Sequence, residues 1–338
     1  MTSLFRRPSR RGLIACTGAV AITGALRTRH AFCQTITATP PPGADADHDT
    51  ANLAAGRDLA NHLTIDVQIN GQGPYHFVVD TGAERSVIAD NVAARLALPA
   101  GRPVTIDGIS KRIEVPSSHI DSLSFGPFNR TGLDLPVLPR ASLFADGYLG
   151  LDVINGTRTT FDFQHRLMRI EQPKSKPNAP GRGVESTHIR TKGSDGRLRI
   201  IDCLVDNLSA TAFIDTGAEV SVGNVALMTA LKARNRQLVS RGTMTLTGVT
   251  GGEFTGDILP VKRIRLQDLT FTDGTLVIAD VPDFSVWKLR QRPALLIGMD
   301  YLRQFSAVTI DYRSKEIRFD LSLAPPKLLP GVKIDRTA

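Results

Sequence analysis

Two aspartates in this 338-residue sequence stand in the same tetrapeptide, Asp-Thr-Gly-Ala, and each follows a run of apolar residues. Asp80 follows Phe-Val-Val, and Asp215 follows Phe-Ile. A carboxylate at the end of a buried strand is unusual, because an isolated buried charge is unfavourable unless it is paired, hydrogen-bonded or protonated. The glycine of each turn lets the backbone bend tightly, and the threonine can hydrogen-bond across a symmetric contact. We therefore expect supporting roles for Thr81, Gly82, Ala83, Thr216, Gly217 and Ala218.

One such turn presents a single carboxylate, whereas two turns that face each other about a pseudo-twofold axis bring two carboxylates together. Two neighbouring carboxylates cannot both ionise easily, so they share a proton. The ionised member can take a proton from a bound water as general base, while the protonated member donates to a carbonyl group. Such a pair titrates as a unit, so the sequence does not assign the proton to either residue. We predict that Asp80 and Asp215 are the catalytic residues.

The two turns belong to an internal repeat in which three blocks recur in the same order. The first block is the strand and turn with the aspartate, the second contains Gly-Ile-Ser or Gly-Val-Thr, and the third contains Leu-Gly-Leu-Asp or Ile-Gly-Met-Asp. The glycines of the later blocks follow the aspartate by 28 and 70 residues in the first copy and by 33 and 83 in the second, at Gly108, Gly150, Gly248 and Gly298. The second copy therefore has longer loops.

The first 33 residues combine an Arg-rich start, an apolar run over 13–26 and small residues before Gln34, which is the pattern of a signal peptide. The sequence Ser-Arg-Arg-Gly-Leu at 9–13 resembles the twin-arginine export signal of bacteria. The apolar run is shorter than the roughly 20 residues of a membrane-spanning helix, so we expect no stable membrane anchor. Six arginines here account for six of the eight net positive charges, and the remaining +2 gives no support to nucleic-acid binding. We expect an exported protein, periplasmic or secreted.

The segment PKSKPNAPGRG between the two copies has the composition of an exposed linker. The mature chain is predicted to be mainly β, because apolar and polar residues alternate between Asn-Gly, Gly-Pro and Asp-Gly turns. Short helices are expected at 90–96 and 224–231, where Asp or Asn could cap an apolar periodic stretch. The predicted organisation is a signal peptide at 1–33, a flexible tether or short prosegment at 34–57, an N-terminal lobe at 58–172, a linker at 173–187, a C-terminal lobe at 188–322 and an irregular tail at 323–338.

The Asp-Thr-Gly-Ala turn, followed later by an apolar-apolar-Gly segment, resembles the aspartic peptidases and specifically their retropepsin-like branch, over residues 60–170 and 195–320. The resemblance implies an all-β fold of two homologous β-barrel lobes related by a pseudo-twofold axis, with short helices. In that family the Gly segment passes beneath the catalytic turn, which implies a buttress role for Gly150 and Gly298. The blocks after Val104 and Met244 resemble flap hairpins, which implies substrate-binding roles for Asp107, Gly108, Ile109, Thr247, Gly248 and Val249.

Two departures from the pepsin pattern point toward retropepsins. Neither flap contains a tyrosine, and an alanine rather than Ser or Thr follows each Asp-Thr-Gly, at Ala83 and Ala218. Without a hydroxyl at these positions, one hydrogen bond that favours the ionised carboxylate is missing. We therefore expect a less acidic pH optimum than that of a pepsin, and an optimum below about pH 3 would count against this argument.

Four other acids point to structure rather than chemistry. Asp152 and Asp300 directly follow the buttress segments, where a short helix could begin, so we expect each of them to cap free N–H groups. Asp162 and Asp311 recur at a strand position of the two copies and are expected to be structural.

Metal, serine and cysteine chemistry are not indicated. The histidines show no metal-ligand spacing, so we predict no metal and no cofactor. Ser86 and Ser221 lack the Gly-x-Ser-x-Gly context of a serine hydrolase. Outside the leader Cys203 is alone, so no intramolecular disulfide is expected.

The leading hypothesis is an endopeptidase that binds an extended peptide by strand addition. The expected substrate is a bacterial envelope protein or peptide, because the leader sends the chain there. The alternative is a non-catalytic peptide-binding or scaffold protein, and the presence of both aspartates argues against it. Each half could also pair with its equivalent in another chain, but the linker makes intramolecular pairing effectively more concentrated, so we expect activity as a single chain.

Overall fold

The structure is a computed structural model that describes residues 50–54, 56–57, 63–108, 112–172, 185–193, 197–321 and 333–336. These residues belong to one compact unit, which extends from Ala46 to Ala338. The predicted signal peptide at 1–33, most of the linker and much of the tail lie outside the described residues, as does Ile109.

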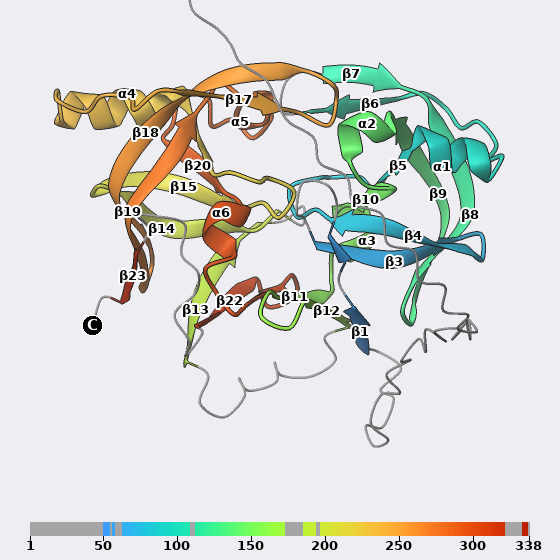
Figure 1. Ribbon diagram of the computed structural model, residues 1–338. Coiled ribbons are helices and arrows are strands. Elements are labelled where there is room, and N and C mark those ends of the chain that lie inside the picture. Colours follow the sequence, from blue (N-terminus) through green and yellow to red (C-terminus); the bar gives the residue numbers. More distant parts are fainter. Residues whose placement is uncertain are drawn as a thin grey trace, which may run out of the picture. The chain divides into compact units, whose positions relative to one another are not determined.

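The N-terminal lobe is a closed barrel of six of the described strands, in the order β3-β4-β10-β5-β9-β8 (Figure 1). β8 pairs back onto β3 and closes the ring. β3 alternates buried and exposed residues, as a strand with one face in the core must, and its Ile65, Val67 and Ile69 are fully buried. The strands are β3 (Leu63–Ile69), β4 (Gln72–Val79), β10 (Gly147–Leu149), β5 (Val87–Ala89), β9 (Phe128–Leu138) and β8 (Ser117–Phe125).

The C-terminal lobe repeats this arrangement in the order β14-β15-β20-β16-β19-β18, and β18 closes onto β14. The turns that join the first two strands of each lobe also match. Asn70 and Gly71 both have positive φ, as do Asp206 and Asn207, which suits a tight two-residue hairpin. The strands are β14 (Arg199–Val205), β15 (Leu208–Ile214), β20 (Ala294–Ile297), β16 (Val222–Gly223), β19 (Leu269–Ile278) and β18 (Glu253–Leu266). The fold is therefore all-β with two homologous barrel lobes, as the resemblance implied.

An antiparallel sheet joins the lobes, in the order β1-β12-β11-β21-β22-β13. Its middle pair, β11 with β21, places Thr160 opposite Thr309, and their hydroxyls lie 2.9 Å apart. The order is symmetric about this pair, because equivalent strands of the two repeats lie at equal distances from it. The strands are β1 (Thr50–Ala54), β12 (Leu167–Glu171), β11 (Arg158–Asp162), β21 (Ala307–Asp311), β22 (Glu316–Leu321) and β13 (Glu185–Lys192).

Three predicted boundaries differ from the structure. Residues 50–57, expected to belong to a flexible tether, contain β1 and the short β2 (Gly56–Arg57), because β1 pairs with β12 just as β13 pairs with β22. β13 begins at Glu185, inside the segment predicted to be a linker. The predicted irregular tail contains β23 (Lys333–Arg336), which pairs with β19.

Short helices occupy the loops. α1 (Asp90–Arg95) and α4 (Val225–Arg234) lie where the sequence predicted them, and Asn224 caps α4 by accepting a hydrogen bond from Leu227 N at 2.8 Å. The others are α2 (Arg140–Leu143), α3 (Leu151–Ile154), α5 (Pro282–Val286) and α6 (Met299–Leu302). Within the described ranges, none of the helices has the length and apolar character needed to cross a bilayer.

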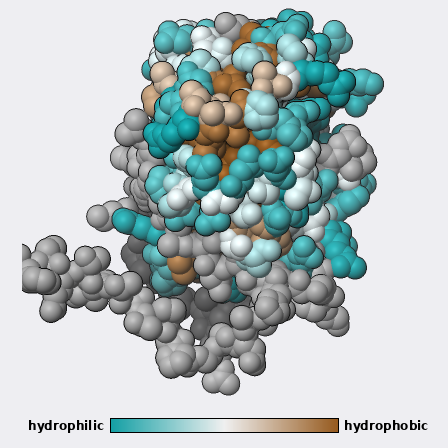
Figure 2. All heavy atoms as spheres, turned by 90° about the vertical axis from the view of Figure 1, so that its right-hand side faces the viewer, coloured by the Kyte–Doolittle hydropathy of each residue, from teal (hydrophilic) through white to brown (hydrophobic). Residues whose placement is uncertain are grey.

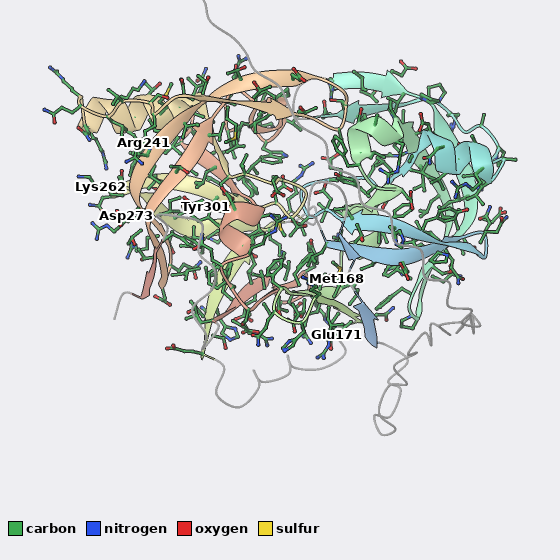
Figure 3. The ribbon with its side chains drawn as sticks, in the orientation of Figure 1. Met168, Glu171, Arg241, Lys262, Asp273 and Tyr301 are labelled. Atoms are coloured by element: carbon green, nitrogen blue, oxygen red, sulfur yellow. The ribbon has the colours of Figure 1, made fainter. Side chains whose placement is uncertain are left out.

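The core runs through both lobes and the sheet between them. Partly buried apolar residues pack against its edge, including Ile106 and Ile113 of the first flap. Figure 2 faces the N-terminal lobe and shows apolar surface framed by hydrophilic side chains. In the C-terminal lobe Tyr301, labelled in Figure 3, packs edge-on against Phe271 and donates a hydrogen bond to Thr275 O at 3.0 Å.

Candidate active site

The two aspartates lie at equivalent places, each just beyond the second strand of its barrel. Asp80 follows β4, and its N–H donates to Leu149 O at 2.9 Å. Asp215 follows β15, and its N–H donates to Ile297 O at 3.0 Å. In each lobe the acceptor belongs to a strand that runs parallel to the aspartate strand, β10 or β20. The same pairing therefore positions both aspartates.

The glycines of the two turns show that the carboxylates come together. A Cβ atom added to Gly82 would lie 2.6 Å from Oδ2 of Asp215, and one added to Gly217 would collide with the carboxylate of Asp80. Each glycine thus lies against the aspartate of the other lobe. The sequence predicted a tight bend at these glycines, and the structure adds this close contact with the opposite carboxylate. Any side chain here would push the two halves of the site apart.

Backbone N–H groups hold one oxygen of each carboxylate. Oδ1 of Asp80 accepts hydrogen bonds from Gly82 N at 2.8 Å and from Ala83 N at 3.0 Å. Oδ1 of Asp215 accepts one from Gly217 N at 2.9 Å. Both aspartates are only half-buried. Both carboxylates therefore keep solvent access.

Thr81 and Thr216 form the cross-lobe contact that the sequence predicted. The N–H of each threonine donates to the hydroxyl of the other at 3.1 Å. The hydroxyl of Thr81 donates to Ile214 O at 3.0 Å, and that of Thr216 donates to Val79 O at 2.7 Å. Both side chains are buried, so this set of bonds ties the two turns together away from water.

The two predicted buttress glycines lie directly beneath the turns. A Cβ atom on Gly150 would lie 2.6 Å from the carbonyl carbon of Arg85, and one on Gly298 would lie 2.8 Å from Ala218 O. Only glycine allows this approach of two backbones. The residues that follow them continue the contact, because Leu151 N donates to Ala83 O at 2.9 Å and Met299 N donates to Ala218 O at 2.8 Å.

Two serines complete this support, and the sequence reasoning assigned them no role. Ser86 Oγ accepts from Gly150 N at 3.0 Å and donates to Asp152 at 2.7 Å. Ser221 Oγ accepts from Gly298 N at 2.8 Å and donates to Asp300 at 2.7 Å. Both serines are buried. Their recurrence six residues after each aspartate was the available signal.

The capping role expected of Asp152 and Asp300 is seen in one bond, in which Tyr301 N of α6 donates to Oδ1 of Asp300 at 3.0 Å. Glycine occupies the N-cap positions of α3 and α6, and neither helix has a side-chain cap. Asp152 and Asp300 accept hydrogen bonds from Ser86 and Ser221 of the catalytic turns. Both carboxylates therefore bind mainly the turn, because the turn presents its own N–H and hydroxyl groups to them.

Tyr312 is a further residue near the pair that the sequence did not indicate. It is buried, and with Thr81 and Ile214 it lines a small cavity. Burial raises the pKa of its hydroxyl, and the charges of Asp80 and Asp215 raise it further. The equivalent residue of the first repeat is Phe163, so the surroundings of the pair are not fully symmetric.

The predicted flap residues other than Ile109 lie on two hairpins at the top of Figure 1. The first joins β6 (Val104–Asp107) to β7 (Arg112–Val115), and Asp107 accepts two hydrogen bonds from Arg112 at 2.6 and 3.0 Å. The second joins β17 (Thr243–Thr247) to β18. Thr247 ends β17, Val249 packs against the edge of the core, and Gly248 N donates to Gly252 O at 2.8 Å.

The two hairpins approach each other at Gly108 and Thr250. The Cα of Gly108 lies so close to the side chain of Thr250 that an added Cβ atom would collide with it. Thr250 is buried, and a Cβ atom on the next residue, Gly251, would lie 3.7 Å from Ser142 Oγ on α2. The second flap therefore contacts the first flap, and its Gly251 lies close to α2 of the N-terminal lobe.

Among the described residues, no group of three His, Cys, Asp or Glu side chains is placed to hold a metal ion. The site consists of two carboxylates, a hydroxyl pair that joins the lobes, and backbone groups. This set can move protons to and from a bound molecule.

A model of the aspartyl protease family matches the chain twice, over residues 65–153 and 201–301. The two matches follow the two repeats, each contains one of the turns, and together they cover more than half of the chain. No curated protein matches the sequence. The chain belongs to the aspartyl protease family, with one retropepsin-like repeat in each lobe.

Proposed function

We propose that this protein is an endopeptidase in which Asp80 and Asp215 form a single acid–base pair. The observation that carries the proposal is the reciprocal contact of the turns, in which Gly82 lies against Asp215 and Gly217 lies against Asp80. Two carboxylates this close share one proton at the pH where the site works. The family match supports proteolysis in general, and the pair supplies a route for it.

The proposed reaction needs no group other than the pair and a water molecule. The ionised carboxylate takes a proton from the water as its oxygen attacks the peptide carbonyl carbon, and the protonated carboxyl donates its proton to the carbonyl oxygen. The pair then donates its proton to the peptide nitrogen and the C–N bond breaks. One of the two hydroxyls on the former carbonyl carbon gives its proton to the pair, so a carboxylic acid and an amine leave and the pair returns to its starting state.

Substrate would bind as an extended strand beneath the two flap hairpins. Main-chain hydrogen bonds to the hairpins would supply affinity, and pockets for alternate side chains would supply selectivity. Because both turns belong to one chain and share the Thr81–Thr216 bonds, we propose that a single chain forms a complete site. The partners proposed are peptides or proteins, without nucleic acid.

The cellular setting rests on residues 1–33, whose pattern favours export. We propose that the mature protein acts in the periplasm or outside the cell, without a stable membrane anchor, on envelope proteins or peptides. Fractionation of cells that express the full chain with a C-terminal tag tests this. A tagged product shortened by the length of the leader is expected in the periplasm or medium, and full-length protein in the cytoplasm would contradict it.

Cleavage of a peptide library tests the catalytic proposal. The protein without its leader should cut the library, and Asp80→Asn should abolish cleavage while it retains the circular dichroism spectrum of the unmodified protein. Unchanged cleavage by Asp80→Asn would overturn the role of the pair. If the unmodified protein binds peptides but cuts none, the protein is a non-catalytic binder.

A further inference from the structure

The two Ser–Asp pairs beneath the catalytic turns differ in how the carboxylate receives its hydrogen bonds. In the N-terminal lobe the N–H and the hydroxyl of Ser86 both donate to the same oxygen of Asp152, Oδ1, at 2.9 and 2.7 Å. In the C-terminal lobe the hydroxyl of Ser221 donates to Oδ1 of Asp300 at 2.7 Å, while its N–H donates to Oδ2 at 3.0 Å. Tyr301 N also donates to Oδ1, at 3.0 Å.

This difference decides what a proton would do to each pair. Both oxygens of Asp300 already accept hydrogen bonds. The Ser221 hydroxyl oxygen accepts from Gly298 N, so the hydroxyl proton of Ser221 points at Asp300. A proton on Asp300 would therefore face a donor and displace one of these bonds. The side chain of Asp152 reaches further into solvent than that of Asp300, and its Oδ2 lies outside the two Ser86 bonds. It can take up a proton there without losing either bond.

The charges around Asp300 make this protonation relevant in mild acid. Burial raises the pKa of Asp300 to about 6, although hydrogen bonds from Ser221 and Tyr301 lower it, and the carboxylate of Glu219 adds to the rise. Glu219 in turn forms an ion pair with Arg303 at 2.6 Å. Asp300 thus gains a proton within the range where many proteins operate.

The N-terminal pair has a positive charge beside it. Burial raises the pKa of Asp152 too, but the Ser86 bonds and the charge of Arg85 oppose the rise. The second repeat has Val220 at the position of Arg85, in otherwise identical Asp-Thr-Gly-Ala-Glu-x-Ser-Val segments. The two copies therefore differ at the residue that would keep the carboxylate ionised.

We propose that the Ser221–Asp300 pair positions Asp215, and that it holds the C-terminal turn fully only while Asp300 is ionised. The Ser86–Asp152 pair holds the N-terminal turn whether Asp152 is ionised or protonated. The path from this pair to Asp215 is short. Ser221 Oγ accepts a hydrogen bond from Gly298 N, and the preceding residue, Ile297, accepts one from Asp215 N at 3.0 Å. The inference rests on the proposed function only for its kinetic readout.

Matched amide variants test the difference between the pairs. Asp300→Asn places an N–H₂ group against a donor, so kcat on a library peptide at pH 7.5 should fall at least about tenfold with KM little changed, because small displacements of reacting groups slow catalysis strongly. Asp152→Asn is the matched comparison and should lose clearly less kcat than Asp300→Asn, since its amide nitrogen can take the solvent side while its carbonyl oxygen keeps both Ser86 bonds. Equal losses in the two variants, or no loss in Asp300→Asn, would overturn the inference.

The pH profile supplies a second test that does not depend on an amide. In the unmodified protein kcat should fall as the pH drops below about 6. Val220→Arg copies the N-terminal turn and should move this fall to lower pH by roughly one unit, as an opposite charge nearby does. A fall that stays in place in Val220→Arg would contradict the role of Asp300.

Amide hydrogen exchange separates this inference from the proposed function, because it needs no activity. After correction for intrinsic exchange rates, the amides of residues 215–223 should exchange faster at pH 5 than at pH 7.5. The amides of residues 80–88 should exchange at the same corrected rate at both pH values. Equal behaviour of the two turns would overturn the inference even if Asp80→Asn abolishes cleavage. If Asp80→Asn still cleaves peptides but the two turns differ in amide exchange as expected, the proposed function is overturned and the inference about the Ser221–Asp300 pair stands.

Discussion

Replacing Thr81 by valine removes a hydroxyl that bonds across both lobes and nearly preserves the shape of the side chain. The hydroxyl donates to Ile214 O at 3.0 Å and accepts from Thr216 N at 3.1 Å. The two threonine side chains are only 7% and 3% exposed, so water does not readily replace the lost partner. The variant therefore leaves one buried carbonyl and one buried N–H without their bonds.

The magnitude follows from those two groups. Each buried polar group left without a partner costs about 1–3 kcal/mol, so Thr81→Val should lower the free energy of unfolding by about 2–6 kcal/mol. Thr216→Val should cost a similar amount, because its hydroxyl donates to Val79 O and accepts from Thr81 N. The two hydroxyls belong to one set of bonds, so the double variant should not show the sum of the single losses.

Urea unfolding followed by circular dichroism and by the fluorescence of the single tryptophan, Trp287, measures this loss. Thr160→Val is a matched control, because the Thr160–Thr309 hydroxyl bond also joins the lobes but leaves no backbone group without its partner. The control should lose about 1 kcal/mol. Losses for Thr81→Val no larger than for the control, with additive effects in the double variant, would refute the reasoning.

Three further results are expected. Because burial raises the pKa of Asp300 to about 6, the folded state keeps a proton that the unfolded chain has lost. This group should therefore lower the stability by about 3 kcal/mol as the pH rises from about 4 to 7, seen as a pH-dependent difference from Asp300→Asn in urea unfolding. Arg158→Met should cost about 3–5 kcal/mol by the same assay, because it leaves the buried carboxylate of Asp311, 2.8 Å away, without its cation, and a loss below about 1 kcal/mol would contradict this. Ala83→Ser adds a donor beside Asp80, which favours the ionised carboxylate, so the acid limb of the pH–rate profile should move to lower pH, and a move to higher pH would contradict the argument.

The local chemistry of the turns could be predicted from the sequence because it depends on few residues. The tetrapeptide at Asp80 and Asp215 needs glycine for close approach and threonine for the cross-lobe bonds, and the structure has both features. The repeat predicted the symmetric arrangement, and the structure has matching barrels closed by equivalent strand pairs. Patterns that recur in both copies carried most of this information.

The rest depended on partners far away in the sequence. β1 is short and polar at its start, and it is a strand because it pairs with β12 more than 100 residues later. The recurrence of Ser86 and Ser221 marks them as equivalent, but their role follows from contacts with Gly150, Asp152, Gly298 and Asp300, more than 60 residues later. The closeness of Tyr312 to the two aspartates likewise follows only from the folded sheet between the lobes.

The support beneath Asp215 illustrates a common conflict between stability and function. Ionised Asp300 accepts the bonds that hold the turn, yet burial disfavours its charge. The protein would be more stable with this carboxyl protonated and better ordered at the site with it ionised. Functional sites often keep such costly groups where a replacement would stabilise the fold.

The most direct measurement of the central claim is kcat/KM of Asp80→Asn, Asp215→Asn and the double variant on one library peptide. Residues that act as one unit lose their effect together, so each single variant should lose as much activity as the double variant. Retention of substantial cleavage by either single variant, or losses that multiply in the double variant, would show that the two aspartates do not work as a pair.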